Sequence, residues 1–303
     1  MKAHIGIVTW NRLHLTQICL ESLFAKTRGN FTCTVVDNGS SDGTIDYLKA
    51  LSASTPNVTI RLLSRNMGVS VASNLAWDDA GEADFFVKLD NDVEILDSDW
   101  LVRLEHLYQE NPTIGPLGYK LCSWHTGSSH TLSDGTKVLT VPCCNGACAC
   151  IPRPLFEKLG FWNEGYGVYG FEDLDYSWRA LRVGSLPVYA DVEKALVHHG
   201  KEPKERDTHQ EMIKLSSRTA AISGTESYLL HLFLFEKGIL PLKTIRKYIP
   251  IVKDGFYTFK INNEYKKVQK LINTLVKTIN ITQDGETSRL DLRGWKQEKN
   301  SEV

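Results

Sequence analysis

The sequence predicts an α/β protein with a Rossmann-like, mostly parallel sheet flanked by helices. Two observations predict this fold. Over the first 112 residues, short apolar runs typical of strands alternate with segments of helical periodicity. Four successive runs then end in polar side chains, at the place where an open α/β sheet holds its ligands. The 303 residues are enough for one such domain with an appendage.

The first half of the domain follows a regular pattern. The expected strands are 3–9, 32–36, 58–63 and 85–89, and the expected helices are 13–24, 69–79 and segments near 44–51 and 100–108. Each helix carries apolar residues at three- and four-residue spacing, as Leu15, Cys19 and Leu23 do. Ser41 or Asp42 is suited to cap the second helix.

The pattern changes after residue 112. Gly, Pro and Ser interrupt residues 113–151, where only short strand-like pieces are expected. One clear helix is predicted at 172–183, with Leu174, Trp178 and Leu181 on its buried face, and a strand follows at 186–190. We place the domain at 1–205, and we expect the extension 206–303 to be mostly helical, above all over 208–277.

Polar residues cluster after the four expected strands. They are Thr9, Asn11 and Arg12; Asp37 and Asn38; Arg65, Asn66 and Gly68; and Asp90, Asn91 and Asp92. Two carboxylates two residues apart can turn towards one Mg²⁺ or Mn²⁺ ion, although they could also cap a polar turn. Because no Gly-rich phosphate loop is present, a phosphate would need a metal together with Arg12, Arg65 or Lys88.

Two further motifs lie in the second half. Glu172, Asp173 and Asp175 lie at the start of the predicted helix. Negative charge there complements the helix dipole. Capping of the helix would explain one such acid well, but it explains three acids poorly. His198 and His199 follow a strand-like segment. Such a histidine is usually structural, yet it could add an imidazole ligand to a metal held by the carboxylates.

Several of these motifs recur in one known family. They are Ile5–Arg12, Val35–Thr44, Asn66–Asn74, Asp90-Asn91-Asp92, Asn145–Cys148, Glu172-Asp173 and Val197-His198. In order and separation they resemble glycosyltransferase family 2, which has the GT-A fold, over about residues 3–200. Lys88 departs from the family pattern and could pair with a diphosphate or with Asp90.

The resemblance implies an inverting, metal-dependent transfer of a sugar from a nucleoside diphosphate sugar to an acceptor hydroxyl. A UDP-sugar donor, Mn²⁺ or Mg²⁺, and a role in surface glycan or polysaccharide synthesis are expected. Residues 1–112 would form the nucleotide-sugar half, and 113–205 the acceptor half.

The resemblance also implies individual roles. Asp173 would be the general base and Glu172 would orient the acceptor. Asp92 would bind the metal, with His198 or His199 beside it. Thr9 and Asp37 would hold the base and ribose, and Asp90 would contact ribose or sugar. The remaining donor-binding residues would be Asn11, Arg12, Asn38, Arg65, Asn66, Gly68, Asn74, Lys88 and Asn91.

Two other functions compete with this one. A sugar-1-phosphate nucleotidyltransferase is also a nucleotide-binding α/β enzyme, but it resembles a pattern with a Gly-rich loop after the first strand, which Thr9–Arg12 does not supply. A non-catalytic nucleotide- or carbohydrate-binding module would not need Asp90, Asp92 and Asp173 together.

Composition narrows the partners and the compartment. The net charge of −1 provides no global field for nucleic acid. Because the N-terminus has no signal-like apolar run, we expect a cytoplasmic protein. Residues 237–277 hold ten Lys or Arg and two acids, interleaved with apolar residues. They could form a peripheral contact with the inner face of a membrane, near a lipid-linked or glycan acceptor. They could equally be a packed appendage with a solvated basic face; a nucleic-acid acceptor is less favoured.

Seven cysteines include four within residues 143–150. Their spacing lacks the paired C-x2-C pattern of structural zinc sites. Buried, reduced thiols are therefore the favoured interpretation.

Overall fold

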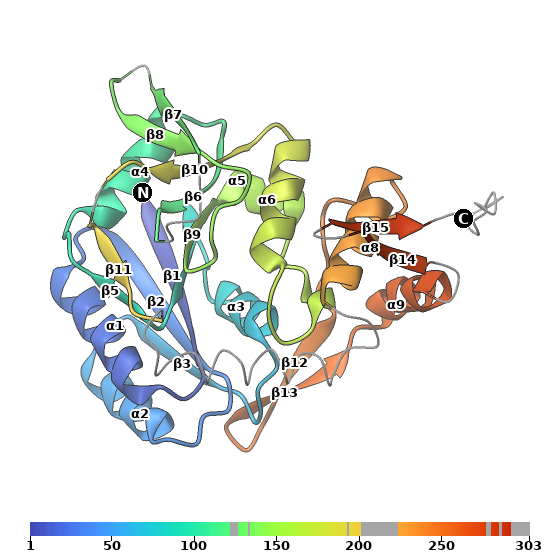
Figure 1. Cartoon of the computed structure of the whole chain (residues 1–303). Coiled ribbons are helices and arrows are strands. Elements are labelled where there is room, and N and C mark those ends of the chain that lie inside the picture. Colours follow the sequence, from blue (N-terminus) through green and yellow to red (C-terminus); the bar gives the residue numbers. More distant parts are fainter. Residues whose placement is uncertain are drawn as a thin grey trace.

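A nine-stranded sheet with helices on both faces forms the centre of the molecule (Figure 1). The computed structural model describes residues 1–121, 127–132, 134–192, 194–200, 224–276, 280–284 and 287–291. The strand order is β3-β2-β1-β4-β9-β6-β10-β8-β7. The predicted α/β fold is therefore confirmed.

The first half of the sheet is parallel, as expected. Its strands and helices are β1 (Lys2–Thr9), α1 (Leu13–Lys26), β2 (Asn30–Asp37), α2 (Thr44–Ser54), β3 (Val58–Leu62), α3 (Val69–Trp77) and β4 (Phe85–Asp90). Adjacent side chains of a strand point to opposite faces. Val87 accordingly packs in the apolar cluster beneath α1 and α2, and Phe86 in the cluster beneath α3.

The second half makes the sheet mixed, although most of its strands still run in one direction: β9 and β8 are the strands that oppose the others. Its elements are α4 (Trp100–Glu110), β6 (Ile114–Tyr119), β7 (Ser128–Thr131), β8 (Lys137–Thr140), β9 (Cys148–Pro152), α5 (Arg153–Leu159), η1 (Glu164–Tyr166), α6 (Glu172–Arg182) and β10 (Leu186–Ala190). Strand β9 runs antiparallel to both β4 and β6. A parallel pair needs a crossover of a dozen or more residues, usually a helix, and residues 113–151 are too broken by Gly and Pro to supply one.

The buried face of α6 also differs from the prediction. Leu174 and Leu181 are 39% and 41% exposed, whereas Tyr176, Arg179 and Ala180 are buried. Arg179 donates to Asp175 through Nε at 2.8 Å and Nη2 at 2.6 Å. Because the two charges compensate each other, a polar stripe replaces the apolar one that periodicity suggested.

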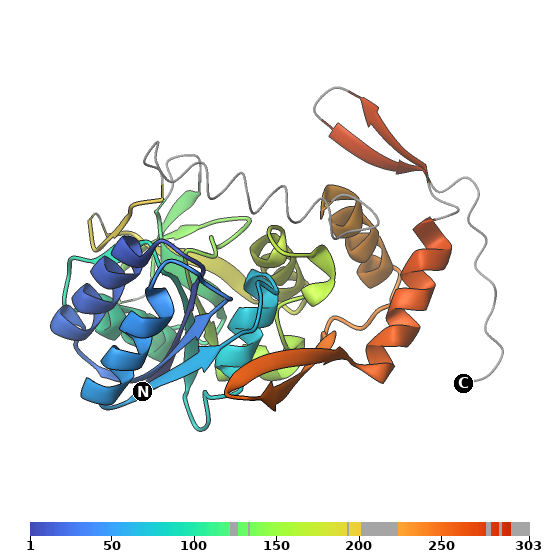
Figure 2. The ribbon, with the colours of Figure 1, turned by 90° about the horizontal axis from the view of Figure 1, so that it is seen from below.

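The C-terminal segment is only partly helical. It contains α8 (Gly224–Glu236), β12 (Tyr248–Lys253), β13 (Phe256–Ile261), α9 (Asn263–Val276), β14 (Asn280–Asp284) and β15 (Thr287–Asp291). The mostly helical interpretation of 208–277 was wrong over 248–261, which is a β-hairpin (Figure 2). Asp254 and Gly255 at its turn have φ angles of 52° and 79°, the pair of left-handed residues that a tight hairpin favours. The expected domain boundary near residue 205 lies outside the described residues.

The C-terminal segment packs on α6 and on the end of β3. Trp178 of α6 packs against the apolar cluster of α8 and α9. Tyr257 of β13 forms a bridge with Leu63, directly after β3. Within the described part of the chain, no helix is both long and apolar enough to cross a bilayer.

The four clustered cysteines lie in β9 and in the residues just before it. Cys143, Cys144, Cys148 and Cys150 are buried with free thiols, and Cys148 and Cys150 belong to β9. Burial raises the pKa of the Cys143 thiol. They pack as small apolar residues in the sheet; Cys122 lies outside the described residues.

Candidate active site

Three strand ends bring the predicted polar residues to one edge of the sheet. In the parallel register, Thr9 lies opposite Asp37 and Val8 opposite Asp90. The carboxyl ends of β2, β1 and β4 therefore form a continuous edge. The residues that follow them are the candidates for ligand binding.

Asp37 has one carboxylate oxygen engaged and one available. Its Oδ1 accepts hydrogen bonds from the backbone N–H groups of Gly39 and Ser40, at 3.0 and 2.9 Å. Its Oδ2 is buried and has no hydrogen-bond partner among the residues that the structure describes. Burial raises the pKa of Asp37, although the bonds from Ser40 and Gly39 act in the opposite direction. A buried acceptor without a partner is costly, so Oδ2 is suited to a donor on a ligand.

The turn after β1 is held in a left-handed conformation. Asn11 and Arg12 have φ angles of 57° and 58°, which non-glycine residues rarely adopt. Asn11 accepts from the Ser41 N–H through Oδ1 and donates its own N–H to Ser40 Oγ. This conformation brings Arg12 to the acidic motif, where it donates to Asp92 Oδ2 at 2.9 Å and to Asn91 Oδ1 at 2.7 Å. Such strain is typical of functional sites.

Asn91 and Thr9 support this edge from inside. The Asn91 amide is buried and donates to Thr9 Oγ1 at 3.2 Å and to Thr16 Oγ1 at 2.9 Å. Both side chains are thus engaged within the protein. Thr16, which sequence reasoning missed, completes the network; no motif marked it.

Asp90, Asp92 and His198 form a candidate metal site. One ligand atom from each lies within 4.8 Å of the others. Strand β11 (Leu196–His198) pairs antiparallel with β5 (Val93–Ile95), which sets His198 opposite Val93 and next to Asp92. Two carboxylates and an imidazole suit Mn²⁺ and, less well, Mg²⁺, so the residues present fit such an ion.

The structure separates the two histidines. His198 Nε2 lies 3.2 Å from Asp92 Oδ1, whereas His199 Nε2 lies 2.9 Å from Glu94 Oε2. His198 is thus the histidine at the candidate metal site. Burial raises the pKa of Asp92, but His198 and Arg12 outweigh it and lower that pKa to about 2. Asp92 is a carboxylate at neutral pH.

Lys88 joins the metal site to the start of α6. Its buried ammonium donates to Asp90 Oδ1 and to the Gly146 carbonyl, each at 2.6 Å. Burial lowers the pKa of Lys88, but the charges of Asp90 and Glu172 outweigh burial and raise it. Two partners were expected for Lys88, a diphosphate or Asp90, and in the structure Lys88 forms an ion pair with Asp90.

Glu172 and Asp173 differ sharply in environment. Asp173 Oδ2 accepts from the Gly146 N–H at 3.1 Å, and Oδ1 accepts from the Leu174 N–H at 2.8 Å. Glu172 is buried, and within the described part of the chain its Oε2 has no hydrogen-bond partner. Burial and then the charge of Asp173 raise the pKa of Glu172 to about 7, although Lys88 opposes them. A Cβ on Gly146 would lie 3.2 Å from Lys88 Nζ, so glycine keeps this junction open.

The other expected donor-binding residues shape the surrounding loops. Asn38 accepts from the Met67 N–H at 2.8 Å and donates to the Gly68 carbonyl at 3.3 Å. Asn66 accepts from the Gly68 N–H at 2.9 Å. A Cβ on Gly68 would lie 2.7 Å from the Val168 Cα, so glycine permits this close approach. These contacts order the loop after β3.

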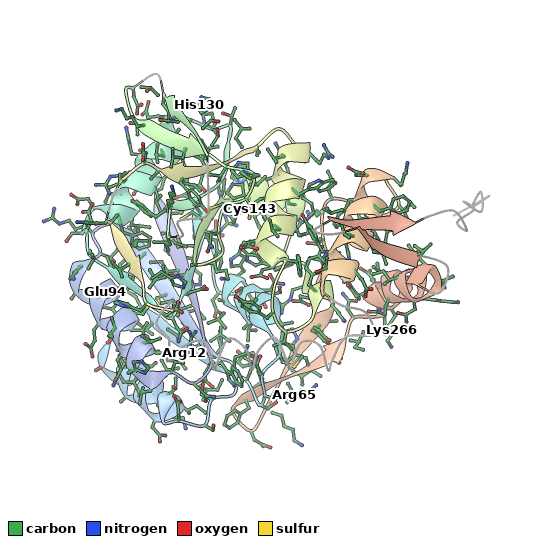
Figure 3. All side chains as sticks on the ribbon, in the orientation of Figure 1. Arg12, Arg65, Glu94, His130, Cys143 and Lys266 are labelled. Carbon is green, nitrogen blue, oxygen red and sulfur yellow. The ribbon has the colours of Figure 1, made fainter. Side chains whose placement is uncertain are left out.

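Asn74 lies within α3, whereas Arg65 lies beside the turn after β2, where a Cβ on Gly39 would be 2.7 Å from the Arg65 Cα. The Asn74 amide donates to Glu164 Oε1 at 2.8 Å and to the Trp162 carbonyl at 2.9 Å, and it accepts from the Trp162 N–H. Its contacts tie α3 to the loop before α6. Arg65 is exposed, and its charge acts on Tyr248 of β12. In Figure 3, Arg12 lies on the acidic edge and Arg65 beside the hairpin.

The mixed sheet with an acidic carboxyl edge defines a GT-A-like α/β protein. Comparison with known proteins agrees. The model of the family described as glycosyl transferase family 2 matches residues 4–160, more than half of the chain. The chain therefore belongs to glycosyl transferase family 2.

Solved structures of low sequence identity share the fold. The mannosyltransferase PcManGT of Pyrobaculum calidifontis, in complex with GDP-Man and Mn²⁺, is 17% identical with a TM-score of 0.53 and covers 77% of this chain and 69% of its own. GalNAc-T7 with UDP, GalNAc and Mn²⁺ is 13% identical with a TM-score of 0.54, and the match covers 70% of this chain and 48% of GalNAc-T7. S. aureus TarS 1–349 with UDP-GlcNAc is 16% identical with a TM-score of 0.53, and the match covers 78% of this chain and 73% of the TarS chain.

A curated relative matches by sequence. The uncharacterized protein y4gI of Sinorhizobium fredii is 24% identical over 230 residues, and the match covers 67% of this chain. The chain spans only a quarter of that relative's length, since 25% of it is covered.

Proposed function

We propose that the protein is a metal-dependent, inverting glycosyltransferase that moves a sugar from a nucleoside diphosphate sugar to an acceptor hydroxyl. One observation carries the proposal. Asp90, Asp92 and His198 converge at the carboxyl edge of the sheet, and Lys88 connects Asp90 through Gly146 to Asp173. A site for a divalent ion and a candidate base are thus part of one cluster.

The donor would lie along the strand ends. Asp37 Oδ2 would accept a hydrogen bond from the nucleobase, because it is a buried acceptor at the end of β2 without a partner among the described residues. Asp90, Asp92 and His198 would hold Mn²⁺ or Mg²⁺, and Arg12 would add positive charge beside Asp92. When bound, the ion supplies the positive charge that a leaving diphosphate needs.

Asp173 would take the proton from the acceptor hydroxyl. The N–H groups of Gly146 and Leu174 hold its carboxylate in place. A positioned carboxylate can serve as general base if it lies within hydrogen-bond reach of the hydroxyl. With its pKa raised to about 7, Glu172 is partly protonated at neutral pH, which limits the negative charge next to Asp173.

A UDP-sugar is the first choice of donor, and surface glycan or polysaccharide synthesis is the proposed context. UDP or UDP-GlcNAc accompanies GalNAc-T7 and TarS in their structures, whereas PcManGT holds GDP-Man. The bound nucleotide thus varies among proteins of this fold, and GDP-sugars belong in the test.

The first experiment measures ligand binding by thermal shift. UDP, GDP and their common sugar derivatives are added to the full chain with Mn²⁺ or with EDTA, because a ligand of the folded state raises its melting temperature. Turnover of each stabilising donor is then followed by the product released. Metal-dependent release of nucleoside diphosphate is expected. Release of pyrophosphate from sugar phosphate and nucleoside triphosphate would instead identify a nucleotidyltransferase, and metal-independent binding without turnover would identify a binding module.

A further inference from the structure

Exposed apolar side chains are concentrated on the β12–β13 hairpin and its base. Of the thirteen large apolar residues that are exposed in the described part of the chain, five lie between residues 245 and 261. They are Ile245, Ile249, Ile251, Val252 and Ile261, with exposures from 37% to 61%. Clusters of this kind mark interaction surfaces more often than single exposed residues do.

The hairpin register separates an inner from an outer face. On the inner face, Tyr257 and Phe259 pack against the core cluster beneath α3, and Arg61 donates to the Tyr257 hydroxyl. The outer face carries three cross-strand pairs. They are Ile249 with Lys260, Ile251 with Thr258, and Lys253 with Phe256. This set of six residues is called the outer face below. It includes two of the five exposed residues, Ile249 and Ile251; Val252 and Ile261 fall on the inner face, and Ile245 precedes β12.

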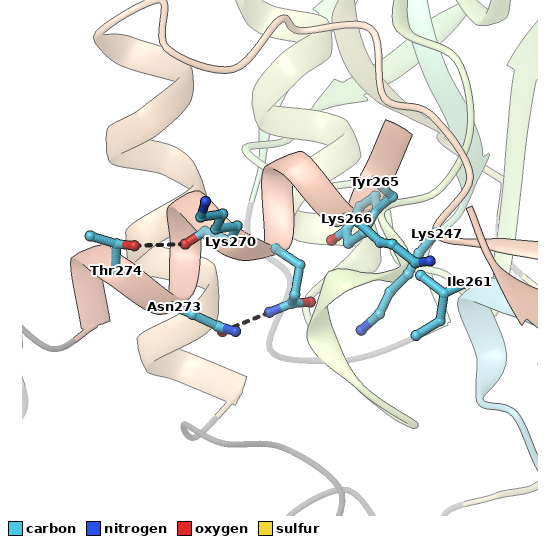
Figure 4. Close-up of a pocket in the computed structure, with 8 residues that line it drawn as sticks. Lys247, Ile261, Tyr265, Lys266, Lys270, Asn273 and Thr274 are labelled. Carbon is cyan, nitrogen blue, oxygen red and sulfur yellow. Dashed lines mark hydrogen bonds between the residues drawn. The ribbon is translucent and has the colours of Figure 1, made fainter. Parts of the chain in front are cut away.

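The outer face is basic as well as apolar. Lys253 and Lys260 are exposed, and the single acid of the hairpin, Asp254, lies at its turn. At the base of the hairpin, Lys247, Lys266 and Lys270 line a groove of about 430 Å³ (Figure 4). Since the whole chain has a net charge of −1, this positive surface is a local feature.

We propose that the outer face docks on an anionic phospholipid bilayer. Ile249, Ile251 and Phe256 would enter the interface between headgroups and acyl chains. Lys253 and Lys260 would contact the lipid phosphates. Peripheral binding of this kind combines buried apolar area with attraction to anionic lipids.

Features of the edge disfavour a second protein strand as the occupant. Strand β12 pairs only with β13 among the described residues, so no strand covers its other edge there, although the Tyr248 N–H at its start donates to Glu164. Pro250 has no N–H to donate there, and Lys253 places a charge at its end. Both features disfavour the pairing of a further strand with β12. A lipid surface needs no backbone pairing.

The position of the hairpin relates this surface to the candidate active site. The Leu63–Tyr257 bridge places β13 at the carboxyl end of β3, the strand next to β2 in the sheet. A docked bilayer would thus lie beside the edge that carries Asp37. The inference stands apart from sugar transfer, since bilayer binding is measured without donor or acceptor.

The test is sedimentation of the full chain with lipid vesicles. Phosphatidylcholine vesicles are compared with vesicles that also contain phosphatidylglycerol, at low and high salt. We expect binding only to the anionic vesicles, weakened by salt because screening shortens the reach of the lysine charges. Lys253→Glu/Lys260→Glu and Ile249→Ser/Ile251→Ser should each reduce the bound fraction, the lysine pair by roughly tenfold or more.

Matched variants distinguish docking from general effects. Lys49→Glu/Lys137→Glu makes the same charge change at exposed sites on α2 and β8, and Val102→Ser/Leu186→Ser removes exposed apolar groups from α4 and β10. Both controls should sediment like the wild type, and circular dichroism should show all variants folded. Equal losses in the control pairs, or no binding of the wild type to anionic vesicles, would overturn the proposal. So would a change in oligomeric mass for Ile249→Ser/Ile251→Ser without vesicle binding, since it would identify a protein interface.

Discussion

Arg246 and Glu164 form an ion pair between the C-terminal segment and the loop that leads to α6. Arg246 Nε lies 3.1 Å from Glu164 Oε1, and the glutamate side chain is fully buried. Glu164 Oε1 also accepts from Asn74, and its Oε2 accepts from the Tyr248 N–H at 2.9 Å. The C-terminal segment therefore completes the support of the loop before Glu172, and it is no detachable appendage.

Arg246→Met should destabilise the fold strongly, because it leaves the Glu164 carboxylate buried without its cation. Removal of one partner of a buried pair costs about 3–5 kcal/mol, which chemical denaturation can measure. Arg246→Met/Glu164→Gln should recover part of the loss. Arg182→Met is the control, since its pair with Glu236 is about half exposed and such pairs contribute about 0–1 kcal/mol. Equal effects of Arg246→Met and Arg182→Met would contradict the prediction.

Asp37→Asn should weaken UDP binding while the protein stays folded. The asparagine Oδ1 can still accept from Gly39 and Ser40, but an NH₂ group replaces the free Oδ2. Hydrogen bonds to charged groups contribute about 1.5–3 kcal/mol, which predicts a roughly 10- to 100-fold rise in Kd by titration calorimetry. Asp46→Asn, an exposed change on the next helix, should leave Kd unchanged. If Asp37→Asn binds UDP as tightly as the wild type, this side chain does not bind the nucleotide.

His198→Ala should weaken Mn²⁺ binding, and His199→Ala should not. Only His198 lies beside Asp92, whereas His199 pairs with Glu94. Titration of the metal in the presence of UDP measures the effect without enzyme activity, and Asp92→Asn should weaken binding as well. Equal UDP affinity of the wild type with Mn²⁺ and with EDTA would show that these residues hold no metal for the nucleotide.

Asp173→Asn should preserve donor affinity and slow sugar transfer. Asparagine keeps the shape and can still accept from Gly146, but it cannot take a proton. The expected loss in kcat is roughly 10²–10⁴-fold, the usual contribution of general acid–base catalysis. If the variant turns over at nearly the wild-type rate, the base lies elsewhere, and Glu172→Gln becomes the decisive comparison.

Glu172 should make stability fall as the pH rises. Its pKa is raised from 4.5 to about 7 in the folded protein, so the folded state holds a proton that the unfolded chain releases. This contribution is complete below the unfolded pKa and is lost as the pH rises through the folded one. In Glu172→Gln the contribution is absent. Its unfolding free energy relative to wild type should therefore increase by roughly 1–3 kcal/mol between about pH 5 and 8. A constant difference over that range would contradict the raised pKa.

Local patterns were sufficient for much of the fold and for the acidic edge. Apolar runs separated by amphipathic helices predicted β1 to β4, and the residues after them predicted the polar edge around Asp37 and Asp90. The Asp254-Gly255 pair is a local hairpin signal as well, and it lies at the turn of the β12–β13 hairpin, where the expectation of helix was wrong. On α6, apolar spacing failed because Asp175 and Arg179 neutralise each other in the core.

The sequence by itself determined which residues end the parallel strands, because strand and helix periodicity are properties of neighbouring residues. Only the tertiary structure decided which side chains meet across long separations. The β5–β11 pairing places His198, and not His199, beside Asp92. Arg12 contacts Asp92 across 80 residues of sequence, and Lys88 donates to Asp90 and to the Gly146 carbonyl. The mixed order of the second half and the anchoring of Arg246 on Glu164 were likewise decided there. These contacts depend on where whole elements pack, and spacing along the chain does not encode that.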